Sequence, residues 1–131
     1  MKFISTRGKS EPCTISEAMK QGLAPDGGLY VPESWPSGEI DPAWADLELA
    51  EFAPKILAPF FAGDPLEGAL PEICTHAFDF SVPLKSIGAD THLLELFHGP
   101  TSAFKDFGAR FLALCLDRIP DERARDRMVL V

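Results

Sequence analysis

The sequence predicts an α/β protein: a mostly helical N-terminal part with short strands, followed by the beginning of an α/β domain. Two observations lead to this prediction. Capped helix patterns alternate with turns and short β segments in residues 1–80, whereas residues 81–131 follow the order extended segment, helix, extended segment. The order strand, helix, strand is typical of a βαβ unit, the repeating piece of α/β sheets. We therefore expect two domains, residues 1–80 and residues 81–131.

Caps and turns define the elements of the first part. In chain order we expect a strand at residues 2–5, a helix from Thr14 to Gln21, a tight turn at residues 25–28, a β segment at residues 29–31, a helical turn opened by Asp41 and Pro42, and helices at residues 49–61 and 64–78. Thr14 and Glu17 have the spacing of a capping box, which favours a helix start. Gly22 favours the end of that helix.

The two longer helices of this part follow from spacing and capping. Apolar residues recur every four positions within residues 49–61, which indicates one apolar helix face. Pro54 is expected in the first turn of that helix, where proline is tolerated. Asp64 is expected to cap the next helix. His76 is expected near the C-terminus of that helix in a structural role, since a partial positive charge there suits the helix dipole.

The second part is expected to open the α/β domain. Its predicted elements are extended residues 82–84, a strand at residues 92–97 and a helix from about Ser102 to Ile119 that Pro120 closes. Residues 128–131 are all apolar and predict a strand of the kind that is normally covered on both faces. Because the sequence stops at this strand, we expect the chain to be part of a longer protein.

Composition and charge narrow the class of protein. The chain has 131 residues, of which 46% are hydrophobic and 24% charged, as is typical of a soluble globular domain. Its net charge of −8 argues against a nucleic-acid partner, because an acidic surface repels phosphate backbones. The N-terminus lacks the apolar core of a signal peptide, and no apolar stretch is long enough to span a membrane. We therefore expect neither secretion nor a membrane partner.

The cysteine content indicates a reducing compartment. Cys13, Cys74 and Cys115 are odd in number and form no CxxC pair, so we expect reduced thiols in a cytoplasmic protein. No cluster of cysteine and histidine has the spacing of zinc ligands, and no metal site is expected.

Lys105 is the candidate residue that the helical pattern singles out. On a helical wheel it shares an apolar stripe with Leu112 and Leu116, whereas Asp106 and Arg110 occupy a polar face as a pair four residues apart. The positive end of the helix and partial burial both favour a neutral amine, the form that attacks an aldehyde. The alternative is that Lys105 reaches past the stripe into water. Spacing alone leaves both possibilities open.

Three motifs, in the expected order, resemble those of the threonine synthases. The run His-Gly-Pro-Thr-Ser-Ala-Phe-Lys-Asp at residues 98–106 resembles the HGPT-x-AFKD motif of that family. The run Ser-Thr-Arg-Gly at residues 5–8 and the run from Gly22 to Pro32 resemble its N-terminal signatures. The resemblance covers essentially the whole chain. It implies a fold-type II enzyme in which Lys105 forms a Schiff base with pyridoxal 5′-phosphate.

The resemblance also implies a reaction, in which O-phospho-L-homoserine and water give L-threonine and phosphate. Lys105 would act as the general base at the α and β carbons, and the cofactor would serve as the electron sink. The expected partner is thus a small-molecule substrate.

The neighbours of Lys105 have candidate roles of their own. Thr101 or Ser102 is expected to cap the lysine helix, which leaves free amides pointing into the site. His98 either contacts the cofactor or substrate or fixes the turn, and the residues favour neither. Phe104 and Phe107 are expected in the core. Residues 5–7 either approach the substrate phosphate or form a surface strand edge, with the edge slightly preferred.

One departure from the family pattern stands out. Fold-type II enzymes hold the cofactor phosphate in a glycine-rich loop, and no glycine follows Gly108 in this sequence. We therefore expect residues 1–131 by themselves to be inactive. Two alternatives stay open: a threonine-synthase-like paralogue that eliminates phosphate without making threonine, and a standalone non-catalytic binding module.

Overall fold

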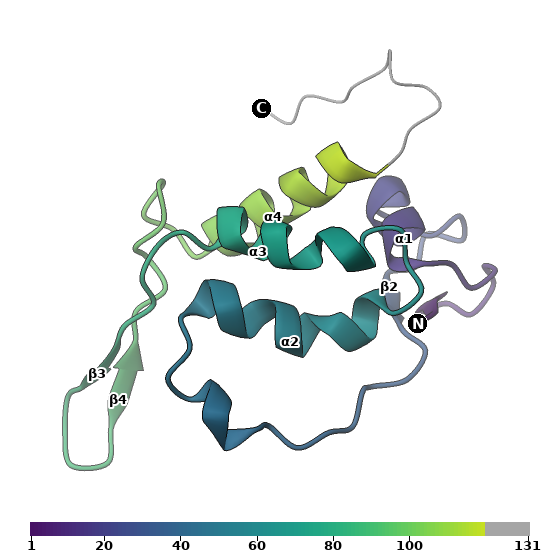
Figure 1. Cartoon of the computed structure of the whole chain (residues 1–131). Helices are drawn as coiled ribbons and strands as arrows, with labels where there is room; N and C mark the ends of the chain where they lie inside the picture. Colours follow the sequence, from purple (N-terminus) through teal and green to yellow (C-terminus); the bar gives the residue numbers. More distant parts are fainter. Residues whose placement is uncertain (120–131) are drawn as a thin grey trace.

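A capping box opens the first helix of this computed structural model, which describes residues 1–119 (Figure 1). The Thr14 hydroxyl accepts a hydrogen bond from the Glu17 amide, and the Glu17 carboxylate accepts one from the Thr14 amide at 2.7 Å. Helix α1 spans Ile15–Gln21 and ends at Gly22, whose φ of 70° requires glycine. The predicted first helix is confirmed at both ends.

The N-terminal strand pairs with the segment that follows the predicted turn. Strand β1 (Phe3–Ser5) lies antiparallel to β2 (Tyr30–Pro32), with Phe3 opposite Pro32. Phe3 also forms a bridge with Cys13, which closes the loop ahead of α1. The turn between α1 and β2 contains Gly27 at a φ of 76°, as the sequence predicts.

Helix α2 (Leu49–Phe61) has the predicted bounds, and a 3₁₀ turn at Pro42–Trp44 precedes it. The Asp41 side chain caps that turn through the Ala43 amide. The placement of Pro54 in the first turn of α2 is wrong: the helix starts at Leu49, so proline lies in its interior. Each interior proline removes one helix hydrogen bond, and burial of the apolar face of α2 against the next helix offsets that cost.

The next helix begins later than its capping pattern predicts. A 3₁₀ turn at Glu67–Ala69 precedes α3 (Leu70–Ala77), so the α-helical start at Asp64 is wrong. Asp64 is buried and accepts hydrogen bonds from the Leu66 amide and from both the amide and the hydroxyl of Ser16. The residue therefore caps a turn and ties it to α1, which explains why regular helix starts farther along.

The core lies among the helices. In Figure 1, α3 lies between α2 and α4 (Lys105–Arg118), and it packs against both. The largest fully buried side chains are Phe61, Leu66, Ile73, Cys74 and Cys115. Helix α1 also packs against α4. Helix α4, from the predicted second domain, thus contacts helices of the predicted first domain, and the division at residue 80 stays a prediction.

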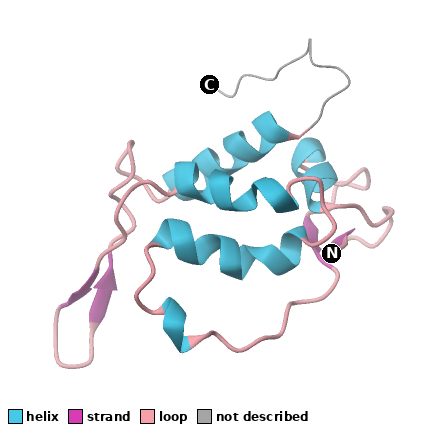
Figure 2. Cartoon of the chain, viewed as in Figure 1, coloured by secondary structure: helices cyan, strands magenta, loops and turns pink. Residues whose placement is uncertain are grey.

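A hairpin precedes the lysine helix. Strands β3 (Leu84–Ser86) and β4 (His92–Leu94) are antiparallel and stand out from the helices (Figure 2). The predicted strand at residues 92–97 is therefore too long, because Glu95 turns inward to bind other side chains. The predicted strand at residues 128–131 and the closing Pro120 lie outside the described residues.

Cys13, Cys74 and Cys115 are all free and buried, which is consistent with the expected reduced thiols. Burial raises the pKa of the Cys74 thiol to about 11 and that of Cys115 to about 12. Among residues 1–119, no helix has the length and apolar character that a membrane crossing needs. The same range holds no group of three or more His, Cys, Asp or Glu side chains placed to bind a metal ion.

Candidate functional site

The loop before α4 folds back onto the first turn of that helix. Helix α4 starts at Lys105, and its N-cap, Phe104, offers no side-chain hydrogen bond. The expected cap at Thr101 or Ser102 is therefore wrong. Ser102 has a φ of 55°, the one positive φ among the described non-glycine residues. The chain turns sharply at this position instead of entering the helix.

Asp106 ties the preceding loop to the first turn of α4. Its carboxylate accepts one hydrogen bond from the Thr101 hydroxyl at 2.7 Å and another from the Thr101 amide at 2.9 Å. Asp106 is only 6% exposed, and the bond from the Thr101 hydroxyl lowers the pKa of its carboxyl. A Cβ on Gly99 would lie 2.7 Å from the Asp106 Cβ, so only glycine fits there. The loop is thereby held against the helix start.

Lys105 is exposed, so the expected partial burial is wrong. The side of α4 that joins the core carries Cys115. Asp106 lies on the opposite side of the helix, where the preceding loop buries it. A second apolar stripe includes Phe111, which packs against Phe61 and against Phe78 and thereby sets the rotation of the helix. Within the described part of the chain, the Lys105 ammonium has no ion pair or hydrogen bond.

Arg110 does not form the expected ion pair with Asp106. Its guanidinium instead lies 2.8 Å from the Asp79 carboxylate and donates a 2.7 Å hydrogen bond to the His76 carbonyl. Both partners follow α3 or lie at its end, so Arg110 joins α4 to α3. His76 itself lies in the last turn of α3, as predicted.

The two phenylalanines beside Lys105 have different surroundings. Phe107 is half-buried and packs against Phe78 and Phe80, so it lies at the margin of the core and not, as was expected, within it. Phe104 is 68% exposed, so its expected burial is wrong. Because Phe104 precedes the first helical residue, it projects from the loop side of α4.

His98 is held by a buried carboxylate. Its Nε2 lies 2.6 Å from Glu95 Oε2, and the Nζ of Lys85 lies 3.1 Å from the other oxygen of Glu95. Glu95 is 7% exposed, and these two bonds lower the pKa of its carboxyl, that from His98 most. Sequence reasoning missed both Glu95 and Lys85. For Glu95 the sequence did hold a signal, since it is the one charged residue in the otherwise apolar residues 93–97.

The N-terminal motifs meet at Asp26. The Ser5 hydroxyl donates to the Asp26 carboxylate at 2.6 Å, and Arg7 donates to its carbonyl at 2.9 Å. Thr6 accepts a bond from the Leu29 amide at 3.0 Å. These contacts confirm the turn at residues 25–28 as a structural feature. Contact between residues 5–7 and a substrate phosphate stays a prediction.

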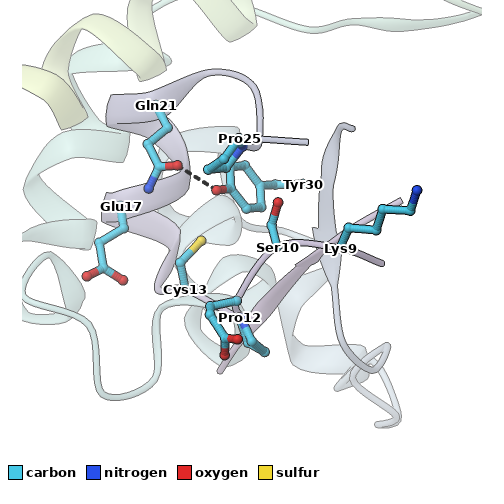
Figure 3. Close-up of a pocket in the computed structure, with 9 residues that line it drawn as sticks. Lys9, Ser10, Pro12, Cys13, Glu17, Gln21, Pro25 and Tyr30 are labelled. Carbon is cyan, nitrogen blue, oxygen red and sulfur yellow. Dashed lines mark hydrogen bonds between the residues drawn. The ribbon is translucent and has the colours of Figure 1, made fainter. Parts of the chain in front are cut away.

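A pocket of about 430 Å³ with a mixed polar and apolar lining lies beside these motifs, at the loop that leads into α1 (Figure 3). It is lined by Lys9, Ser10, Glu11, Pro12, Cys13, Glu17, Gln21, Pro25 and Tyr30. The Tyr30 hydroxyl donates to the Gln21 side chain at 2.6 Å, as Figure 3 shows. None of the predicted cofactor residues lines this pocket, so it lies apart from the Lys105 loop in the described structure.

Comparisons with known proteins agree with the motifs. The family model for the threonine synthase N terminus matches residues 2–78. The chain is 36% identical to threonine synthase of Pseudomonas aeruginosa over 138 aligned positions, covering 100% of this chain and 29% of that protein. It is 39% identical to threonine synthase of Haemophilus influenzae, covering 88% of this chain and 27% of that protein.

Solved structures give the same result. The chain matches a crystal structure of threonine synthase from Brucella melitensis, described as bound to PLP, with a TM-score of 0.83 and 36% identity, covering 89% of this chain and 27% of that one. It matches the Escherichia coli threonine synthase structure with a TM-score of 0.77 and 36% identity, covering 88% of this chain and 28% of that one. The chain thus spans less than a third of the length of these relatives. Because motifs, fold and family model agree, the chain belongs to the threonine synthase family.

Proposed function

We propose that this protein serves the threonine synthase reaction, in which O-phospho-L-homoserine and water give L-threonine and phosphate with pyridoxal 5′-phosphate as cofactor. One observation carries the proposal: an exposed, unpaired lysine stands at the start of α4, directly after a loop that a buried aspartate holds in place. Family membership supports the choice of reaction.

The residues around Lys105 fit a pyridoxal cofactor. An aldehyde needs a free amine, and the Lys105 ammonium has no partner among residues 1–119. We assign Lys105 the covalent role, with His98, Thr101 and Ser102 as neighbouring cofactor residues. The PLP-bound relative from Brucella melitensis is consistent with this cofactor.

Two residues of the chain would then have separate roles: Lys105 in proton transfer and Asp106 in positioning. When bound, the cofactor withdraws electrons from the substrate carbon skeleton. Lys105 would move protons at the α and β carbons. Asp106 holds Thr101 and thereby keeps the loop before Lys105 in one geometry.

The proposal also covers the partners of the enzyme and its location in the cell. Its partner is a small-molecule substrate, with no nucleic acid and no membrane involved. A cytoplasmic location remains a prediction, and the three free thiols are consistent with it.

Preferential modification of Lys105 tests the cofactor assignment. The protein expressed from the complete gene that encodes this chain is incubated with pyridoxal phosphate and borohydride, and the modified lysines are mapped by mass spectrometry. Lys105 is expected to be modified ahead of Lys55, another exposed lysine, which serves as the control in a Lys55→Ala variant. Equal modification of all exposed lysines, or modification at another lysine in a Lys105→Ala variant to the same extent, would count against the assignment.

Growth of a threonine auxotroph tests the reaction. A bacterium that lacks threonine synthase receives the complete gene that encodes this chain, and growth without threonine is expected. The Lys105→Ala variant should not support growth, whereas Lys55→Ala should. Release of phosphate together with a keto acid, without threonine, would instead favour the phosphate-eliminating paralogue. A gene that ends at codon 131 and supports no growth would favour the binding module.

A further inference from the structure

Glu95 links the β3–β4 hairpin to the loop that leads to Lys105. The residue directly follows β4, and its amide donates a 3.0 Å hydrogen bond to the Pro83 carbonyl ahead of β3. Each carboxylate oxygen has its own partner: Lys85 from β3 on one side and His98 from the loop on the other. A buried carboxylate with both oxygens engaged fixes the positions of the groups that it binds.

The chemistry of this contact determines which ring nitrogen of His98 carries a proton. An ionised carboxylate only accepts hydrogen bonds, so the Nε2 that lies 2.6 Å from Glu95 must donate one. Lys85 already supplies the positive charge that balances Glu95, so the contact does not require a charged imidazole. In the neutral ring, a proton on Nε2 leaves the lone pair on Nδ1.

The ring is also held in its plane. The Phe97 ring stacks on it with a centroid separation of 4.7 Å and an interplanar angle of 28°. The next residue, Gly99, lies close against the Asp106 side chain, which fixes the backbone after His98. Among the described residues, Nδ1 of His98 has no hydrogen-bond partner, so it is the ring atom left for a ligand.

We propose that Glu95 is a positioning residue that fixes His98 as the Nε2–H tautomer and leaves Nδ1 as a hydrogen-bond acceptor ahead of the Lys105 loop. An acceptor suits an ammonium, hydroxyl or water donor and does not suit a phosphate oxygen. The identity of that donor rests on the proposed function, in which the substrate is an amino acid. The tautomer itself does not depend on the proposed function, because the contact exists without any ligand.

The chain contains its own control for this proposal. Nδ1 of His76 lies 2.8 Å from the Glu72 carbonyl, which can only accept, so His76 must hold its proton on Nδ1. His98 and His76 are thus expected to be opposite tautomers in one molecule. Long-range proton–nitrogen NMR spectra of the nitrogen-15-labelled chain, recorded at a pH where the rings are neutral, distinguish the two forms directly. Assignment uses His76→Gln and His92→Gln variants.

The expected spectrum shows His98 protonated on Nε2 and His76 protonated on Nδ1. A His98 ring protonated on Nδ1, a mixture of both forms, or a ring still carrying both protons would overturn the proposal. This measurement uses the unmodified chain, so it decides the matter even where a variant fails to fold.

A Glu95→Gln variant then tests whether Glu95 is the cause. Its side-chain amide can donate as well as accept, so His98 should shift to a mixture of tautomers while His76 remains unchanged. A purely structural role for Glu95 would leave the His98 tautomer as it is, and that result would refute the proposal. Far-UV circular dichroism verifies the fold of the variant. Failure of Lys105 modification by pyridoxal phosphate would refute the proposed function and leave the tautomer result standing, so the two outcomes remain distinct.

Discussion

The Thr101 hydroxyl donates a 2.7 Å hydrogen bond to Asp106, and the Thr101 amide donates a second, of 2.9 Å, to the other oxygen of the same carboxylate. A residue in the first turn of α4 thus reaches back five positions and closes the loop that leads to Lys105. This arrangement differs from a conventional N-cap, in which a side chain ahead of the helix accepts hydrogen bonds from amides inside it. The order of donor and acceptor along the chain is reversed.

Removing the Asp106 carboxylate should therefore release the loop. In an Asp106→Ala variant the Thr101 amide loses its acceptor, and its hydrogen exchange should become faster than in the unmodified chain. The amide of Leu114, in the middle of α4, should exchange as before. Equal protection of Thr101 in both proteins, measured by NMR, would show that the loop does not depend on Asp106.

Adding a single methyl group at Gly99 should destabilise the fold. A Cβ there would collide with the Asp106 side chain, and such overpacking typically costs about 1–3 kcal/mol of unfolding free energy. Gly38→Ala is the matched control, since nothing lies within 4 Å of its added Cβ, and its effect should stay within about 0.5 kcal/mol. Urea unfolding of both variants measures the difference. Equal midpoints would contradict the close packing of this loop.

The sequence predicts an element correctly where interactions between near neighbours in the chain decide it. The capping box of Thr14 and Glu17, the stop at Gly22 and the bounds of α2 were predicted because residues within one turn decide them. The start of α4 was not predicted, since Asp106 binds a residue that the pattern had assigned as the cap. These errors arise where a side chain reaches beyond its own turn.

The burial of Lys105 was predicted wrongly for a related reason. A helical wheel identifies apolar stripes but does not state which stripe faces the core when a helix carries two. Contacts of Phe111 with Phe61 and Phe78 decide the rotation of α4, and these partners lie more than thirty residues away in the sequence. The contact between Glu95 and Lys85 is likewise tertiary. The helical pattern singles out Lys105, but the motif and not the spacing favours its cofactor role.

Asp26 should contribute to an acid-dependent loss of stability. Hydrogen bonds to its ionised carboxylate, first that from Ser5, lower its pKa from 3.8 to about 2. A group whose pKa is lower in the folded state stabilises the fold above its unfolded pKa, and this contribution is lost as the pH falls from about 4 toward 2. Several other carboxyls share this direction, so the share of Asp26 must be isolated by substitution.

An Asp26→Asn variant isolates that share. Its melting temperature should fall less steeply than that of the unmodified chain between pH 4 and pH 2, the window that the two pKa values of Asp26 define. Asp46→Asn, at an exposed position, should follow the unmodified profile. Parallel curves for Asp26→Asn and the unmodified chain would show that the bonds at Asp26 contribute no acid sensitivity.

Truncating Phe61 should test the core between the helices. Phe61 is fully buried at the end of α2 and packs edge-to-face against Phe111 of α4. A Phe61→Ala change removes this contact and leaves a cavity, which typically costs about 3–5 kcal/mol. Leu23→Ala, at an exposed position, should change the unfolding free energy by no more than about 0.5 kcal/mol. Thermal or urea unfolding provides the measurement, and similar losses in both variants would contradict this assignment of the core.

Residues 1–131 by themselves are expected to bind pyridoxal phosphate weakly and to form no threonine. A reversible bond between an aldehyde and one exposed amine is weak unless other groups hold the cofactor, and affinity in cofactor enzymes rests largely on polar contacts set on rigid elements. The sequence has no glycine after Gly108, so it offers no glycine-rich phosphate loop beyond Lys105. Titration of the purified chain, followed by visible absorbance, should give a shallow curve without saturation at one equivalent. Tight binding of one equivalent that disappears in Lys105→Ala but not in Lys55→Ala would show that the cofactor site is complete within these residues.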